Sequence, residues 1–284
     1  MALTAVLVLL LALVLGAALT PLAARAGAHL GLLDHPSPIK PHARPTPFTG
    51  GSALFIAFMI AASAGSVSPL VIAGALLAWM VGLLDDIQGL GPLTKLAAEV
   101  PALAIGSLAV DLGPLERLAA IAAGLVMINI FQVTDGLDGL AAGTAVVMLV
   151  LFALVGPSVG LAAAALGATL GFLLFNLPPA RIFLGDEGSL LLGYVLWFVS
   201  IAWYPEAGPL RTLLATGLIW LFPLVNSLYV LVIRLSLGRP LLLGDRSHLY
   251  DYLNRRYGLR NTLALCWGIS AVGLASVATL MRPS

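Results

Sequence analysis

Long apolar stretches separated by short polar clusters make up most of this chain. A helix needs about 20 apolar residues to cross the hydrocarbon core of a bilayer, and fewer when it packs among other helices. The segments that meet this requirement are residues 2–24, 50–66, 69–84, 95–110, 117–133, 140–156, 158–175, 188–204, 210–234 and 261–281. The pattern therefore predicts an all-α polytopic membrane protein with about ten transmembrane helices.

The connections on the two sides of these segments differ in length and polarity. On one side they are short turn-forming clusters such as residues 66–69 and 156–158, whereas the other side carries nearly all the polar residues. The Lys and Arg residues on the polar side are Arg25, Lys40, Arg44, Lys95, Arg181, Arg234, Arg239, Arg246, Arg255, Arg256 and Arg260. Only Arg117, Arg211 and Arg282 fall on the other side. The positive-inside rule makes the polar side cytoplasmic and places both termini outside.

The first apolar run, from Ala2 to about Ala24, has no Lys or Arg before it and is longer than the apolar core of a signal peptide. We expect it to be retained as the first span. The chain contains no internal repeat, low-complexity tract or long linker. Residues 1–284 are therefore expected to form a single integral membrane domain.

The composition agrees with a membrane protein and excludes other classes. Apolar residues make up 60% of the chain and charged residues 10%, with a mean hydropathy of +1.05, which lies outside the range of soluble domains. A net charge of +1 offers no basic field for nucleic acid, so we expect no nucleic-acid partner. The one cysteine, Cys266, cannot form an intrachain disulfide and is expected to be a packing residue.

Acidic residues concentrate on the predicted cytoplasmic side, although acids contribute little to orientation. Asp85 and Asp86 stand where the segment 69–84 ends. Adjacent carboxylates repel each other unless a cation or strong donors neutralise them, and a helix C-terminus is an unfavourable place for them. A solvated surface pair is the plainer alternative, but we favour a functional site.

A second pair of acids, Asp135 and Asp138, lies in the sequence Asp-Gly-Leu-Asp-Gly. Acids three residues apart can share a helix face and converge on one ligand. Gly136 and Gly139 lack the Cβ atoms that would keep a phosphate or a base away from the backbone. A calcium loop is a poor fit because its remaining oxygen ligands and its later Glu are absent.

The sequence Arg-Ile-Phe-Leu-Gly-Asp places Asp186 five residues after Arg181. Asp186 is a candidate metal ligand and Arg181 a candidate phosphate contact. Asp186 could instead cap the next helix, but capping does not account for Arg181.

Two further loops carry candidate phosphate contacts. Five prolines in residues 31–51 keep that loop extended, so it can present Lys40 to an anion, although Lys40 could equally be an orientation charge. Residues 234–260 are expected to form an amphipathic, interfacial segment in which Arg246 and His248 contact a diphosphate.

Five motifs occur in a specific order along the chain: Asp34-x-Pro36 through Gly50-Gly51, Asp85-Asp86, Asp135-Gly-Leu-Asp138-Gly, Arg181-Ile-Phe-Leu-Gly-Asp186-x-Gly-Ser, and Asp245-Arg-Ser-His248. In these motifs the chain resembles the polyprenyl-phosphate N-acetylhexosamine-1-phosphate transferases. This superfamily includes the phospho-MurNAc-pentapeptide translocases and the undecaprenyl-phosphate GlcNAc-1-phosphate transferases. The last motif is closer to the GlcNAc-1-phosphate branch.

The resemblance implies a Mg²⁺-dependent enzyme, with Mn²⁺ as an alternative ion, in the bacterial inner (plasma) membrane with its active-site cleft facing the cytoplasm. It would transfer a sugar 1-phosphate from a UDP-N-acetylhexosamine to undecaprenyl phosphate and release UMP, as the first membrane step of an envelope glycan. Membrane lipids would surround it, and a homodimer is compatible with the family.

By the same resemblance, Asp85 and Asp86 match catalytic acids, and Asp186, Asp138 and Asp135 match the acids around the metal. The positions that match nucleotide or phosphate contacts are Lys40, Asn129, Gln132, Gly136, Gly139, Arg181, Gly185, Arg246 and His248.

The chain departs from the family pattern at positions in and beside these motifs, one of which is Ile39 in place of a basic residue before Lys40. Gln132 stands where the family commonly has Asn, and Tyr250 and Asp251 stand where it has His. The donor sugar therefore stays open, with a phospho-MurNAc-pentapeptide transferase as one alternative. A transporter or flippase would need acids near the bilayer midplane, whereas these acids cluster at helix ends. A non-catalytic homologue is the third alternative.

Overall fold

The computed structural model describes residues 2–36, 44–240 and 246–280, and within them it contains twelve helices and two short strands. The elements are α1 Ala2–Leu30, β1 Leu33–Asp34, β2 Thr46–Pro47, α2 Gly50–Ala64, α3 Pro69–Gln88, α4 Pro92–Ser107, α5 Pro114–Gln132, α6 Leu140–Val155, α7 Val159–Asn176, α8 Gly185–Ile201, α9 Tyr204–Ile219, α10 Leu221–Ser236, α11 Leu249–Tyr257 and α12 Leu259–Leu280.

Every segment predicted to span the membrane coincides with helix, but the segment 210–234 is not one continuous helix. It is divided between α9 and α10, which meet at Trp220. Pro223 in the first turn of α10 has no N–H for the carbonyl group four residues earlier, so one hydrogen bond of a continuous helix would be missing at this break. The expected interfacial segment after residue 234 contains the short helix α11.

Several helices are long and apolar enough to cross a bilayer. Within the described residues, Leu3–Leu30, Pro69–Gln88, Pro114–Gln132 and Val159–Asn176 each meet this criterion alone, and α8 with α9 meets it as a pair bent by 113°. Gly50–Ala64, Leu140–Leu154 and Leu221–Ser236 are apolar but shorter. The chain is therefore a multi-pass helical membrane protein, and the count of ten spans stays a prediction.

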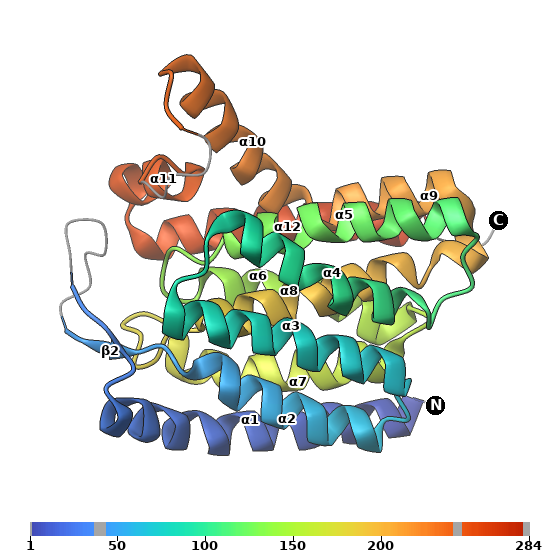
Figure 1. The fold of residues 1–284 in the computed structure, drawn as a ribbon, viewed down its shortest axis with the longest axis horizontal. Helices are drawn as coiled ribbons and strands as arrows, with labels where there is room; N and C mark the ends of the chain where they lie inside the picture. The colour runs from blue at the N-terminus through green and yellow to red at the C-terminus, as the bar shows by residue number, and fades with distance from the viewer. Residues whose placement is uncertain (1, 37–43, 241–245, 281–284) are drawn as a thin grey trace.

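The helices lie side by side in a bundle with α8 near its centre (Figure 1). All residues of α8 from Glu187 to Ser200 are buried, and α8 packs against α3, α5 and α2. A helix that is apolar all round belongs inside a bundle. On one flank α1 packs against α7 and α2, and it exposes Leu3, Leu7 and Val14, as expected of a helix that faces lipid.

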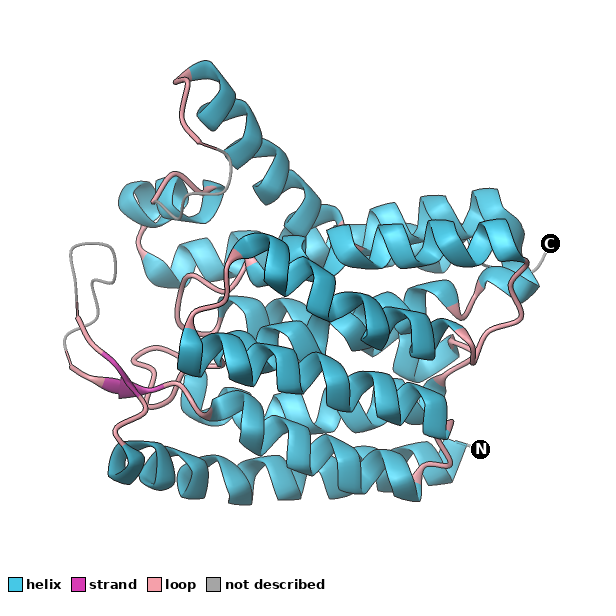
Figure 2. Ribbon diagram, in the orientation of Figure 1, coloured by secondary structure: helices cyan, strands magenta, loops and turns pink. Residues whose placement is uncertain are grey.

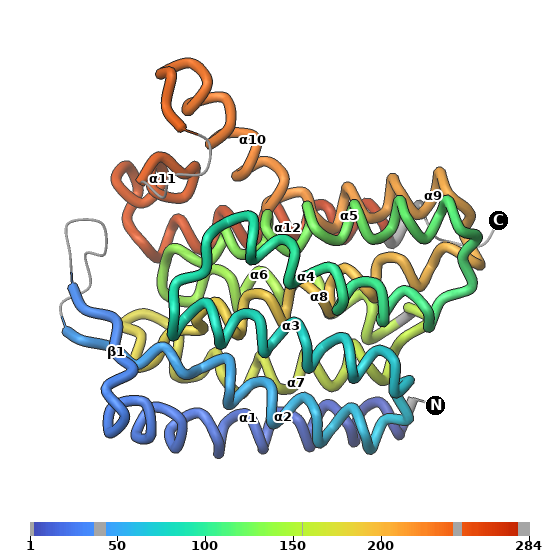
Figure 3. Tube along the Cα trace, viewed as in Figure 1, coloured from blue at the N-terminus to red at the C-terminus, as the bar shows by residue number. Residues whose placement is uncertain are grey.

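The two ends of the bundle differ. α1 begins and α12 ends at one end, whereas the β1–β2 hairpin, α11 and the acid-bearing connections lie at the other (Figures 1 and 2). The trace in Figure 3 shows that the α3–α4, α5–α6 and α7–α8 connections share this second end. In the hairpin, Leu33 pairs with Pro47 and Asp34 with Thr46, which is a small strand addition to the predicted all-α fold. The predicted gathering of the acidic segments at one end of the molecule is confirmed.

Candidate active site

Asp86 joins the end of α3 to the beginning of α8. Its carboxylate accepts hydrogen bonds from the backbone N–H groups of Asp186 and Glu187, each at 3.0 Å. These are two of the N–H groups that a helix N-terminus leaves without an intrahelical partner, and the helix dipole favours an anion there. Asp86 therefore caps α8, and the left-handed Gly185 (φ 71°) brings the chain into this turn.

Lys95, in the first turn of α4, links two of the predicted site acids. Its Nζ lies 2.5 Å from Asp85 Oδ2 and 2.8 Å from Asp186 Oδ2. The Leu90 N–H donates to the other oxygen of Asp85 at 2.7 Å. Lys95 and Asp85 side chains are about 10% exposed and Asp186 is 34% exposed, so Asp186 is the most accessible of the three. In the sequence, Lys95 counts only as one of the basic residues that set the orientation of the chain in the membrane. Its place ten residues after Asp85, across the short glycine turn at residues 89–91, is the signal that could have found it.

The Asp135–Asp138 loop is joined to the α7–α8 connection. Asp138 Oδ2 accepts the N–H of Ala180 at 2.9 Å, and the Gly139 N–H donates to Asn176 Oδ1 at 3.1 Å. Asn176 in turn donates to the carbonyl oxygen of Ile182 at 2.9 Å. Arg181, within the same connection, is exposed. The structure thus places Arg181 beside the acid loop, and it identifies Asn176 as a linking residue that the motifs did not reveal.

Asp135 carries the electrostatic signature of a crowded acidic site. The pKa of its carboxyl group is raised from 3.8 to about 8, mainly because the group is removed from water and further because Asp186, Asp86 and Asp138 repel its charge. A carboxyl group that keeps its proton near neutral pH because it is buried, and further because anions lie near it, loses the proton more readily when a cation binds beside it. The same three residues that repel Asp135 would favour a cation among them.

The fit of a divalent ion to these acids can be tested on the observed contacts. Within residues 2–36, 44–240 and 246–280, no three His, Cys, Asp or Glu side chains lie close enough together to ligate an ion as they stand. Asp186 is bound to Lys95, and Asp138 is bound to a backbone N–H. The donors are nevertheless carboxylate oxygens in negative excess, the ligand type that Mg²⁺ prefers. The residues fit the ion in chemistry and charge, and the ligand set stays a prediction.

The two polar residues near the end of α5 point to different partners. The Asn129 amide donates to Glu99 Oε2 and to the Leu125 carbonyl oxygen, both at 2.8 Å, so it is held within the bundle by a buried acid of α4. Gln132 lies beside the Asp186 carboxyl group. The structure therefore brings Gln132 to the acids, whereas the Asn129 side chain is already engaged elsewhere.

The segment before α11 covers the Asp135–Asp138 loop. Arg246 Nη1 lies 3.1 Å from Asp251 Oδ1 and 3.3 Å from the Gly136 carbonyl oxygen. A Cβ atom at Gly136 would overlap the Tyr250 hydroxyl group, and the Tyr250 ring stacks on His248 with centroids 4.8 Å apart. Tyr250 and Asp251, which depart from the family pattern, thus have defined partners. Lys40 lies outside the described residues.

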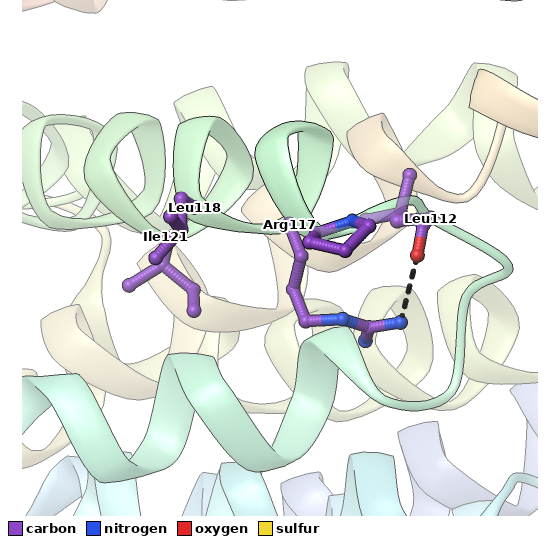
Figure 4. A pocket seen from close by; sticks show the side chains of 5 residues that line it. Leu112, Arg117, Leu118 and Ile121 are labelled. Atoms are coloured by element: carbon purple, nitrogen blue, oxygen red, sulfur yellow. Dashed lines mark hydrogen bonds between the residues drawn. The ribbon is translucent and has the colours of Figure 1, made fainter.

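A hollow of about 430 Å³ lies at the other end of α4 and α5, lined by Leu112, Pro114, Arg117, Leu118 and Ile121 (Figure 4). Its walls are almost wholly apolar, and the Arg117 guanidinium is held by the carbonyl oxygens of Ser107 and Leu112. It contains none of the predicted site residues.

Comparison with known proteins identifies the family of the chain. The model of glycosyl transferase family 4 matches residues 68–204, which include all five predicted site acids. A decaprenyl-phosphate N-acetylglucosaminephosphotransferase of Mycolicibacterium smegmatis is 30% identical over 312 residues, covering 87% of this chain and 75% of that protein. The chain belongs to glycosyl transferase family 4.

Two further relatives show the range of this similarity. A probable undecaprenyl-phosphate N-acetylglucosaminyl 1-phosphate transferase of Bacillus subtilis is 28% identical over 273 residues, covering 87% of this chain and 76% of that protein. A phospho-N-acetylmuramoyl-pentapeptide-transferase of Streptococcus thermophilus is 33% identical, but over 171 residues that cover 50% of this chain and 49% of that protein. The predicted superfamily is confirmed.

Proposed function

We propose that this protein transfers N-acetylglucosamine 1-phosphate from a UDP-sugar to a polyprenyl phosphate such as undecaprenyl phosphate, and releases UMP. The observation that carries the proposal is the Lys95-linked pair Asp85 and Asp186, which adjoins the Asp135–Asp138 loop in a member of glycosyl transferase family 4. Relatives named for GlcNAc 1-phosphate transfer match 82–88% of the chain, whereas the pentapeptide transferase matches half. This difference favours the GlcNAc donor.

In the proposed reaction, a phosphate oxygen of the lipid attacks the sugar-linked phosphorus of the UDP-sugar. The new P–O bond forms as the bond to the UMP oxygen breaks, and the electron pair of the broken bond leaves with UMP. Phosphoryl transfer of this kind depends chiefly on positioning and on neutralisation of charge. A phosphate monoester is already an anion near neutral pH, so no covalent enzyme intermediate is required.

The residues of the chain have distinct parts in this scheme. The Lys95 ammonium, held by Asp85, would contact a phosphate oxygen when a substrate displaces the Asp186 carboxylate from it. Asp85 would thereby orient the lysine, and Asp86 would hold the first turn of α8. Arg181 and Arg246 flank the acids and would hold the diphosphate.

Mg²⁺ is the proposed cofactor, with Mn²⁺ as an alternative ion. Asp186, Asp138 and Asp135 would hold it, and when bound it neutralises negative charge on the donor diphosphate. For these residues to ligate one ion, Asp186 would turn from Lys95 and Asp138 from the Ala180 N–H.

We also propose that the chain spans the membrane about ten times, with both termini outside and the acids facing the cytoplasm of a bacterial cell. The excess of basic residues at the acid-bearing end supports this orientation.

Release of UMP by the purified full chain tests the function. With Mg²⁺ and undecaprenyl phosphate, we expect turnover of UDP-GlcNAc in a panel that also contains UDP-GalNAc and UDP-MurNAc-pentapeptide, and none after chelation of the metal. Asp186→Asn and Asp86→Asn should each lower the rate by about 100-fold or more. The matched control is Asp111→Asn, an exposed acid in the α4–α5 connection, which should retain the wild-type rate. Unchanged turnover in Asp186→Asn would show that the site is assigned wrongly.

A further inference from the structure

Glu187 is a buried acid that the reaction scheme leaves without a role. Glu187 as a whole is 1% exposed. Oε1 accepts the backbone N–H of Ser52 at 2.8 Å, and Oε2 accepts the Ser52 hydroxyl group at 2.6 Å and the Trp79 indole N–H at 3.1 Å. Burial of a carboxylate is costly unless donors surround it, and here three donors do. The fold thus holds a fully satisfied buried anion directly beside Asp186.

The donors to Glu187 come from two other helices. Ser52 lies in the first turn of α2, where the helix dipole favours an anion, and Trp79 lies in α3. The Trp79 indole is held in turn by stacking on Phe55, with ring centroids 4.3 Å apart. The first turn of α8 is therefore tied to both α2 and α3.

In a second contact between α3 and α8, the hydrogen bonds are donated by α8 and accepted by α3. Asp86, on α3, accepts the N–H groups of Asp186 and Glu187, whereas Trp79, also on α3, donates to the Glu187 side chain. Residues seven apart lie on the same helix face about two turns from each other. The two contacts hold the first turn of α8, which carries Asp186, both by its backbone and by the Glu187 side chain.

Glycines allow the backbones to meet at this point. A Cβ atom at Gly82 would overlap the Asp186 carbonyl oxygen and Glu187 Cα, and one at Gly51 would overlap the Gly188 nitrogen. The first turn of α8 is in direct backbone contact with α2 and α3, so it has little freedom to shift while these contacts persist.

We propose that Glu187 is a positioning residue, which fixes the direction of the Asp186 carboxylate by locking the first turn of α8 to α2 and α3. The lock itself stands on the contacts above, and its consequence for turnover rests on the proposed function. Because Asp186 would hold the metal ion that neutralises the donor diphosphate, a loosened lock should raise the Mg²⁺ requirement for turnover more than it lowers the stability of the fold.

Two substitutions loosen the lock while they keep the carboxylate. Trp79→Phe removes the indole N–H and retains a ring that can stack on Phe55, and Ser52→Ala removes the hydroxyl donor. Their matched controls are Trp197→Phe, which removes an indole donor to the Ala120 carbonyl oxygen farther along α8, and Ser63→Ala, which removes a hydroxyl donor on α2. Glu187→Gln removes the charge itself.

Hydrogen–deuterium exchange of the backbone amides of residues 185–188 provides a readout that does not require activity. In the purified full chain, exchange there should be faster by about tenfold in Trp79→Phe and Ser52→Ala than in their controls, since hydrogen bonds to charged groups are the stronger ones. The Mg²⁺ concentration for half-maximal UMP release should rise by about the same factor. The KM for the lipid acceptor should be unchanged, and Glu187→Gln should shift both readouts further.

The two readouts separate this inference from the proposed function. If the wild-type chain releases no UMP with any donor, the proposed function fails and the exchange measurement alone decides whether the lock exists. If the wild-type chain is active and Trp79→Phe and Ser52→Ala match their controls in exchange, the lock is refuted. Faster exchange with an unchanged Mg²⁺ requirement would refute the positioning role, because Glu187 would then serve the fold alone.

Discussion

Lys95 shows how single residues at this site acquire meaning only from their neighbours. It forms ion pairs with Asp85 and Asp186, which approach it from α3 and α8. Asp86, next to Asp85 in the sequence, faces backbone N–H groups instead. Two adjacent acids therefore have different partners, which their sequence spacing does not distinguish. The charge of Asp85 and Asp186 is balanced in part by Lys95, which contacts both carboxylates.

Replacement of Lys95 by Met should remove this balance. The substitution keeps an unbranched side chain one atom shorter but leaves Asp85 and Asp186 without their cation, so we expect UMP release to fall by about 100-fold or more. Arg211→Met, which removes an exposed base from α9, is the control and should retain the wild-type rate. A Lys95→Met variant with normal turnover would contradict the proposed phosphate contact.

Among the elements, α8 organises the site because its first turn meets α3 and its remaining turns form the core of the bundle. Gly82 on α3 faces the first turn of α8 without a side chain between the two backbones. The break between α9 and α10 at Trp220 is the element-level feature that the hydropathy pattern missed, because both helices are apolar and the pattern continues across the break.

Gly82→Ala should force α3 away from α8. The added methyl group would overlap backbone atoms, which cannot rotate away, so we expect a loss of about 1–3 kcal/mol of stability and a lower thermal midpoint in detergent. Gly268→Ala on α12 is the matched control, because nothing lies within 4 Å of the place that its added methyl group would occupy. It should be neutral or stabilising by up to about 1 kcal/mol. Equal midpoints for the two variants would contradict the close approach of α3 and α8.

At the scale of the whole molecule, the charge pattern of the sequence and the fold both distinguish a polar end of the bundle from a less polar one. The acid-bearing connections and α11 share one end, and α1 begins at the other (Figure 1). The apolar hollow near Arg117 lies at the end opposite the predicted site acids.

Thiol labelling can test the proposed orientation. Cys266 is buried, and in a Cys266→Ser background a cysteine can be introduced at Asp111 or at Arg256, which are both exposed at opposite ends. A membrane-impermeant thiol reagent applied to intact cells should label Asp111→Cys and should label Arg256→Cys only after permeabilisation. Labelling of Arg256→Cys in intact cells would reverse the proposed orientation.

The hydropathy pattern by itself determined the helical segments, and it divided the connections between them into two sides of the membrane. The reason is that the hydrocarbon core of a membrane accepts only apolar helices that satisfy their own backbone hydrogen bonds, so each span is marked locally in the sequence. The same local marking found the acids, because carboxylates at helix ends stand out against an apolar background. Asp85, Asp86, Asp135, Asp138 and Asp186 were all identified in this way.

Which helices touch was decided only by the tertiary structure. Lipid is as apolar as the inside of the bundle, so hydropathy does not distinguish the buried α8 from the lipid-facing α1. The pairing of Lys95 with Asp186 and the contacts of Glu187 with Ser52 and Trp79 join residues far apart in the chain. They exist because α2, α4 and α8 begin at the place where α3 ends. The sequence supplied the charged groups, and helix packing determined their partners.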